Sequence, residues 1–154
     1  MNTSTGFLNL ISPEMKLRAL RLLTLLAWMA LIFLISAIPE PLEQTPSAFA
    51  QMLQNMRFLG IQMVAVISFI IHFTLYFVLG FLAVRAFTPG KAALSLKLLL
   101  TPFLVCILYA LSDEFHQQFV PGRGFEWVDL LADVVGIISG LLAYSYKKEG
   151  NCES

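Results

Sequence analysis

The residues best suited to chemistry stand in one short segment, 112–123, which directly follows an apolar run. It contains two acids, a histidine and an arginine, at Asp113, Glu114, His116 and Arg123. Ionisable side chains cost about 2.5 to 3.5 kcal/mol each at the centre of a membrane helix, so they tend to be paired, water-facing and functional. An arginine can bind a phosphate or carboxylate through two parallel hydrogen bonds, and a histidine or glutamate can transfer protons. We therefore expect the functional site at this segment.

The composition places the chain in a membrane. Of its 154 residues, 58% are hydrophobic and only 13% are charged, whereas soluble domains have about 25% charged residues. Four apolar runs are long enough to cross a bilayer as helices. They occupy residues 17–38, 61–87, 94–111 and 127–146. We predict an all-α integral membrane protein with four transmembrane helices, as a single domain over 1–154 with its core at about 17–146.

The basic residues predict the orientation of this bundle. Arg57 and Arg123 fall on one predicted side, and all other basic residues fall on the opposite side. Short cytoplasmic loops carry an excess of Lys and Arg, so both termini are predicted to be cytoplasmic, with the loops 39–60 and 117–126 outside. The basic face should contact anionic lipid head groups, and nothing suggests a nucleic-acid partner. The residues on that face are Lys16, Arg18, Arg21, Arg85, Lys91, Lys97, Lys147 and Lys148.

The first outer loop is predicted to contain a short amphipathic helix. Thr45 is a suitable N-cap and Pro46 a suitable first helical residue. Apolar residues then recur at helical spacing from Phe49 to Met56, with amides opposite them. This helix could cover the bundle like a lid, but its short apolar stripe favours a position in the outer membrane interface.

Helical periodicity predicts which polar side chains face inward. Residues three or four apart share one face of a helix, so the second and third helices each present a polar face near the outer side. These faces carry His72 and Tyr76 in the second helix, and Asp113, His116 and Gln117, flanked by Glu114, at the end of the third.

The fourth helix has one stripe of acids and glycines. Asp129, Asp133, Gly136 and Gly140 follow one another at helical spacing, and a Gly-x-x-x-Gly pattern allows two helix backbones to approach closely. The stripe could form a homodimer, but its acids must face inward, which favours packing within this bundle. The oligomeric state stays open.

Together these motifs resemble the VanZ-like family of small bacterial membrane proteins. The resemblance rests on His72-x-x-x-Tyr76, the Asp-Glu-Phe-His-Gln run at 113–117, Pro121-Gly122-Arg123, and the stripe from Asp129 to Gly140, and it covers about residues 17–146. It implies a bacterial cytoplasmic-membrane protein with a role in the cell envelope, and the family's namesake lowers susceptibility to the glycopeptide teicoplanin. The resemblance carries over His72, Tyr76, Asp113, Glu114, His116, Gln117, Arg123 and Asp129 as the candidate site.

One position departs from the family pattern. Asp133 stands where the family usually has asparagine. An amide could anchor a neutral hydrogen-bond network, whereas a second acid near Asp129 would share a proton or recruit a cation.

Three functions fit these residues, and a binding module is preferred. In it, Arg123 holds the anionic group of an envelope lipid or cell-wall precursor while Asp113, Glu114 and His116 contact its polar part. The second possibility is a hydrolase or transferase that acts on a lipid-linked substrate, with Glu114, His116 or Asp113 as acid or base. The third is a structural lock in which Arg123 pairs with Asp129.

No cofactor is predicted. The chain has no Gly-rich loop that would cradle phosphates, and its two histidines are too far apart for a local metal-ligand spacing. If a metal were bound, the sequence offers His72, His116, Asp129 and Asp133 as its ligands.

Overall fold

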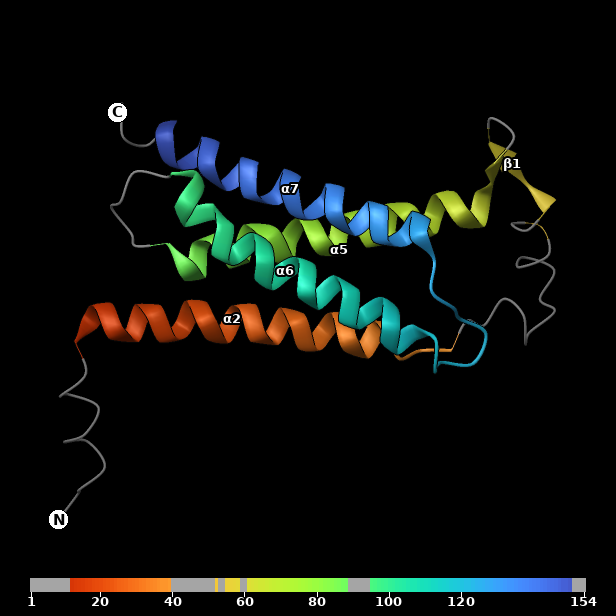
Figure 1. The fold of residues 1–154 in the computed structure, drawn as a ribbon, viewed down its shortest axis with the longest axis horizontal. Helices are drawn as coiled ribbons and strands as arrows, with labels where there is room; N and C mark the ends of the chain where they lie inside the picture. The colour runs from red at the N-terminus through yellow and green to blue at the C-terminus, as the bar shows by residue number, and fades with distance from the viewer. Residues whose placement is uncertain (1–11, 40–51, 53–54, 59–60, 89–94, 151–154) are drawn as a thin grey trace, which may run out of the picture.

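Four long helices make up most of the structure, which is a computed structural model (Figure 1). All four are long and apolar enough to cross a membrane, which confirms the predicted number of spanning helices. The helices are α2 (Pro13–Ser36), α5 (Met63–Phe87), α6 (Leu96–Gln117) and α7 (Trp127–Gly150). The structure describes residues 12–39, 52, 55–58, 61–88 and 95–150. Residues 147–150 are described by their backbone alone.

The helix ends differ from the predicted ones for local reasons. Helix α2 starts four residues early because Ser12 caps it, accepting a hydrogen bond from Met15 N at 3.3 Å, and because Pro13 suits the first turn. Helix α6 continues through the polar segment to Gln117. The charged motif is therefore largely helical.

Helix α5 begins two residues later than predicted. Strand β2 (Ile61–Gln62) pairs antiparallel with strand β1 (Arg57–Phe58) and takes up the start of the predicted helix. Apart from this strand pair, the regular structure of the described residues is all α-helical. The amphipathic helix predicted near residues 45–56 falls largely outside the described residues.

Helices α5 and α7 are packed backbone to backbone. A Cβ atom on Gly136 would lie 2.5 Å from the carbonyl oxygen of Phe73, and one on Gly80 would lie 2.5 Å from that of Ile137. Gly140 meets the carbonyl oxygen of Phe77 in the same way. The glycine stripe of the fourth spanning helix thus faces α5 within the same chain.

Helix α2 is attached mainly through side chains. The indole Nε1 of Trp28 donates to the carbonyl oxygen of Leu75 in α5 at 3.0 Å, and the hydroxyl of Tyr109 in α6 donates to that of Met29. Its outer face exposes large apolar residues, such as Leu23 and Leu34. Such a surface suits contact with lipid.

The two ends of the bundle differ in chemistry. At one end α2 and α6 begin while α5 and α7 end (Figure 1). At the other end α6 runs into the 118–126 loop and α7 begins, which brings the charged motif beside the start of α5. The fold therefore collects the predicted site residues at one end.

Candidate functional site

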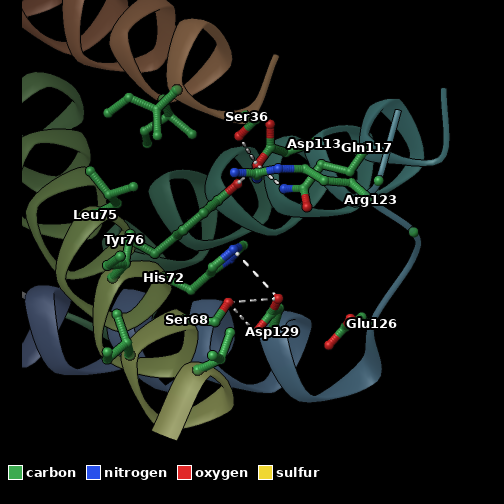
Figure 2. A pocket seen from close by; sticks show the side chains of 17 residues that line it. Ser36, Ser68, His72, Leu75, Tyr76, Asp113, Gln117, Arg123, Glu126 and Asp129 are labelled. Atoms are coloured by element: carbon green, nitrogen blue, oxygen red, sulfur yellow. Dashed lines mark hydrogen bonds and ion pairs between the residues drawn. The ribbon is translucent and has the colours of Figure 1, made fainter. Parts of the chain in front are cut away.

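A cavity of about 220 Å³ lies between α2 and α5, at the end of the bundle where α6 ends (Figure 2). One part of its wall is apolar and comes from α2 and α5. The rest is polar and includes the 122–126 loop. The predicted site residues that line it are His72, Tyr76, Asp113, Gln117, Arg123 and Asp129.

Asp113 forms the centre of the polar wall. Its Oδ2 atom accepts hydrogen bonds from Ser36 Oγ at 2.9 Å, Tyr76 OH at 3.1 Å and Gln117 Nε2 at 3.2 Å. These three donors come from three helices, so the carboxylate ties α2, α5 and α6 together. Its other oxygen, Oδ1, is buried without a hydrogen-bond partner.

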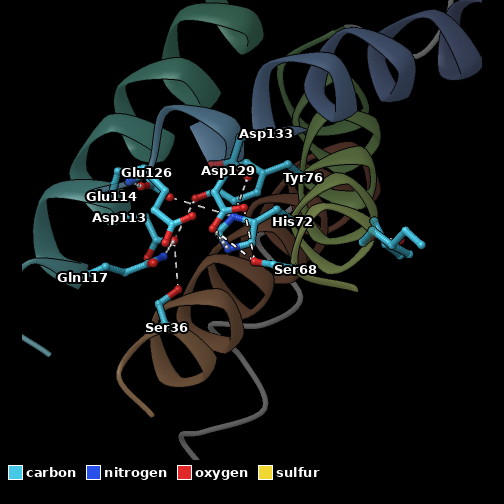
Figure 3. Close-up of polar contacts among 12 residues, drawn as sticks. Ser36, Ser68, His72, Tyr76, Asp113, Glu114, Gln117, Glu126, Asp129 and Asp133 are labelled. Atoms are coloured by element: carbon cyan, nitrogen blue, oxygen red, sulfur yellow. Dashed lines mark hydrogen bonds and ion pairs between the residues drawn. The ribbon is translucent and has the colours of Figure 1, made fainter. Parts of the chain in front are cut away.

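His72 stands among three other carboxylates (Figure 3). Its Nδ1 atom lies 3.0 Å from Asp133 Oδ1 and 3.9 Å from Glu114 Oε1, and its Nε2 atom lies 3.6 Å from Asp129 Oδ2. All four residues are buried. His72 comes from α5, Glu114 from α6, and the other two acids from α7. These side chains therefore come together only when the three helices pack.

Two further contacts hold the acids in position. Ser68 Oγ lies 3.2 and 3.1 Å from the two carboxylate oxygens of Asp129. Glu114 Oε2 accepts a hydrogen bond from the backbone N–H of Glu126 at 3.1 Å. That bond connects the end of α6 to the residue just before α7.

The Pro-Gly sequence forms a tight turn that positions Arg123. The N–H of Arg123 donates to the carbonyl oxygen of Val120 at 3.1 Å, and Gly122 has φ 77°. Proline followed by a residue with positive φ is typical of a type II turn, and glycine adopts that φ without steric cost. The turn directs the half-buried Arg123 side chain into the cavity, toward Asp113 (Figure 2).

Arg123 does not form the lock with Asp129 that was the third possible function. All ion pairs between described residues involve His72, and Asp129 is held by Ser68 and His72 instead. The Nε atom of Arg123 is buried without a hydrogen-bond partner. A cationic fork is therefore available to a ligand in the cavity.

His116 lies apart from the other predicted site residues. Its ring packs against Phe33 of α2, with ring centroids 4.5 Å apart, and its Nδ1 atom has no hydrogen-bond partner. Successive residues are about 100° apart around a helix, so with Asp113 facing the cavity, Glu114 turns toward α7 and His116 toward α2. His116 therefore does not join His72, although the sequence offered both as ligands in case a metal were bound.

Three polar residues of the cavity were not among the predicted site residues, namely Ser36, Ser68 and Glu126. Ser68 precedes His72 by four residues, so the helical spacing could have placed both on one face. Ser36 is an isolated polar residue near the end of a long apolar run. Small hydroxyl side chains give a weak signal, because serine is common in membrane helices for packing reasons alone.

The fold and site define a multi-pass membrane protein with a polar cavity at one end of a helical bundle. The sequence profile of the VanZ/LLP1 family matches residues 21–148, which include all four spanning helices except the first turns of α2 and the end of α7. The chain belongs to the VanZ/LLP1 family. No curated protein and no solved structure matches it.

Proposed function

We propose that this VanZ/LLP1 protein binds an envelope lipid, or a lipid-linked cell-wall precursor, whose head group contains a phosphate. Two unsatisfied atoms of residues that line the cavity support this, Arg123 Nε and Asp113 Oδ1. A buried polar group without a partner costs about 1 to 3 kcal/mol, so a ligand that satisfies both is stabilised. A phosphate for Arg123 and a hydroxyl or ammonium group for Asp113 would do so.

The apolar part of the wall supports a ligand with an acyl chain. Ile67 and Ile71 of α5 line the cavity and are also 39% and 46% exposed. Ile32 and Ile35 of α2 stand on the same wall. The cavity thus continues toward the lipid-facing surface between α2 and α5, where an acyl chain could lie while its head group reaches Arg123.

The distribution of basic residues supports a position of this cavity in the outer leaflet of the bacterial cytoplasmic membrane, with both termini in the cytoplasm. Lys16, Arg18, Arg85 and Lys97 all stand at the end of the bundle opposite Arg123. In a variant without native cysteines, an impermeant thiol reagent on intact cells should label Gln118→Cys and spare Glu14→Cys. The reverse labelling would place the cavity on the cytoplasmic side.

Lipid binding to the purified protein tests the proposed function. Native mass spectrometry should detect phosphatidylglycerol, which has a phosphate and hydroxyl donors, at least about tenfold more readily than phosphatidylcholine, whose head group has no donor. Arg123→Gln should lower phosphatidylglycerol binding by about tenfold or more, and Arg123→Lys should restore little because an ammonium lacks the fork geometry. Arg57→Gln is the matched control, because Arg57 is an exposed arginine outside the cavity. Equal losses in Arg57→Gln and Arg123→Gln would refute specific recognition.

A role in glycopeptide response rests on the family resemblance. If lipid recognition underlies it, expression in a sensitive bacterium should protect against teicoplanin, and Arg123→Gln should reduce that protection while Arg57→Gln should not. Full protection by a stably folded Arg123→Gln variant would separate resistance from this cavity.

A hydrolase or transferase acting on a lipid-linked substrate is the second candidate. His72 favours it, because this side chain lines the cavity and stands within 4.0 Å of three carboxylates, an arrangement suited to proton transfer. A product that forms with the parent protein and disappears with His72→Gln, while lipid binding persists, would establish an enzyme. Binding without any product would favour the module.

A further inference from the structure

The buried cluster behind the cavity has the geometry of a metal site. We infer that His72, Glu114 and Asp133 together bind one divalent transition-metal ion, of the zinc or manganese class. One ligand atom from each of these residues lies within 4.8 Å of the others, and all three residues are buried. This inference concerns a different set of atoms from the lipid contacts of Arg123 and Asp113, so it does not depend on the proposed function.

The spacing of the ligand atoms is close to that of a metal's first shell. Ligands bound at about 2.0 to 2.2 Å from one ion lie about 3.0 to 3.5 Å from each other in tetrahedral or octahedral sites. The His72 Nδ1 atom lies 3.0 Å from Asp133 Oδ1 and 3.9 Å from Glu114 Oε1. A movement of roughly half an ångström would bring Glu114 Oε1 into this range from His72 Nδ1.

Two oxygen atoms in the cluster have no hydrogen-bond partner. Glu114 Oε1 and Asp133 Oδ2 are both buried and unsatisfied, and both residues are 0% exposed. Glu114 cannot simply rotate away, because its other oxygen accepts the backbone N–H of Glu126. A buried carboxylate oxygen without a partner is costly, so the fold keeps it there for a ligand.

A proton on His72 would satisfy the cluster only in part. A hydrogen on Nδ1 can bond to Asp133 Oδ1 at 3.0 Å, but Glu114 Oε1 at 3.9 Å is beyond hydrogen-bond distance. A metal ion between the three residues can contact all of them at once. Its double positive charge would also balance the two buried carboxylates.

The surroundings of His72 match those of a metal-bound histidine. Such a histidine usually directs its second nitrogen to a carboxylate, which fixes the orientation of the ring. Here Nε2 faces Asp129 Oδ2 at 3.6 Å, and Ser68 in turn donates to Asp129. With its proton on Nε2, the ring would direct the Nδ1 lone pair toward Glu114 and Asp133, which lie beside it (Figure 3).

The donor set selects the class of ion. One imidazole nitrogen with two carboxylates suits zinc or manganese better than magnesium or calcium, which favour oxygen ligands alone. Three protein ligands also leave coordination positions open, as in catalytic zinc sites. Because His72 lines the cavity, an open position there could accept water or a phosphate oxygen.

Elemental analysis of the purified protein tests this inference without any lipid ligand. The protein is purified in detergent through a tag that contains no histidine, incubated with zinc or manganese, and dialysed. About one ion per chain should remain, and Asp133→Asn and His72→Gln should each retain less than about a tenth of it. Cobalt added to the parent protein should give the absorption spectrum of a protein-bound ion, which requires no variant.

Asp113→Asn is the matched control, because it removes the charge of a buried carboxylate on the same helix, one residue before Glu114. This variant should keep the ion while losing affinity for phosphatidylglycerol, so the metal site and the lipid site can fail separately. Folded parent protein that binds neither zinc, manganese nor cobalt would overturn the inference. Equal metal content in parent and Asp133→Asn would overturn it as well.

Discussion

The two sides of α5 are built differently. On one side α7 approaches so closely that Gly80, Gly136 and Gly140 meet opposing main-chain atoms. On the other side α2 is attached by hydrogen bonds such as Trp28 to Leu75, and a cavity remains between the two helices. The same helix therefore has one closely packed face and one face with room for a ligand.

Because of this difference, one side of α5 holds the site residues in place and the other side gives a ligand access to the site. The α5–α7 side holds His72, Asp129 and Asp133 in fixed positions, because backbones in contact cannot slide without steric clash. The α2 side contributes Ser36 and Ile35, and it borders lipid. We infer that a ligand enters on the α2 side and contacts Arg123 and Asp113, whereas the α7 side positions the cluster around His72 behind the cavity.

The largest predicted effect breaks the closely packed side. Gly140→Val places a branched side chain where the carbonyl oxygen of Phe77 lies, so it should destabilise the bundle by about 3 kcal/mol, measured by denaturation in detergent micelles. Gly124→Ala is the control, since a Cβ there meets nothing within 4 Å. Equal stability of the two variants would contradict the backbone contact.

A smaller loss of stability is expected at Asp113, which joins α2, α5 and α6. Tyr76→Phe removes a hydrogen bond to a buried carboxylate without changing the side chain's shape, and it should lower the free energy of unfolding by about 2 kcal/mol. Tyr146→Phe, at a tyrosine that is 82% exposed, should have almost no effect. An unchanged Tyr76→Phe variant would show that Ser36 and Gln117 suffice for Asp113.

Filling the cavity should impair binding more than stability. Ile35→Trp enlarges a half-buried residue of the α2 wall, and we expect phosphatidylglycerol binding to fall about tenfold, equivalent to about 1.4 kcal/mol. Leu34→Trp, at a neighbouring residue that is 63% exposed and outside the cavity, should bind as the parent does. Comparable losses in both variants would point to a general effect of tryptophan on α2.

The smallest effect tests the attachment of α2. Tyr109→Phe removes the hydrogen bond to the carbonyl oxygen of Met29 and should cost about 1 kcal/mol. The Met29 carbonyl lies within α2, where it can also accept a hydrogen bond of the helix, so losing the tyrosine hydroxyl leaves no unsatisfied acceptor. Lipid binding should change little, and a large loss of stability would mean that α2 depends on this one contact.

Hydropathy was sufficient to predict the four spanning helices, and the sequence motifs named six of the residues that line the cavity. Spans of about 20 apolar residues have few alternatives in a bilayer, so four helices could be predicted. The Pro121-Gly122 pair is typical of the turn that precedes Arg123, because proline fixes φ at the second residue of a type II turn and glycine adopts the positive φ at the third. Spacing also placed Asp129 and Asp133 on one inward stripe.

The rotation of α6 could not be predicted in the same way. Asp113, Glu114, His116 and Gln117 spread over about 160° of the circumference at its end, so periodicity alone does not decide which of them face the same neighbour. Contacts with α2 and α7 decide it, which is why Glu114 joins His72 and His116 does not. Of the three proposed metal ligands, the sequence suggested His72 and Asp133 but not Glu114, because its position beside them depends on how three helices pack.

The central claim is that an amphiphilic ligand occupies the space between α2 and α5 with its head group at Arg123. A photoreactive amino acid at Ile35, activated in intact membranes, tests it directly when the adducts are identified by mass spectrometry. We predict adducts of a phosphate-containing lipid that fall about tenfold in an Arg123→Gln background. Adducts formed at Leu34 should not depend on Arg123. The account would be contradicted if Ile35 and Leu34 gave adducts with the same lipids and if Arg123→Gln lowered neither yield.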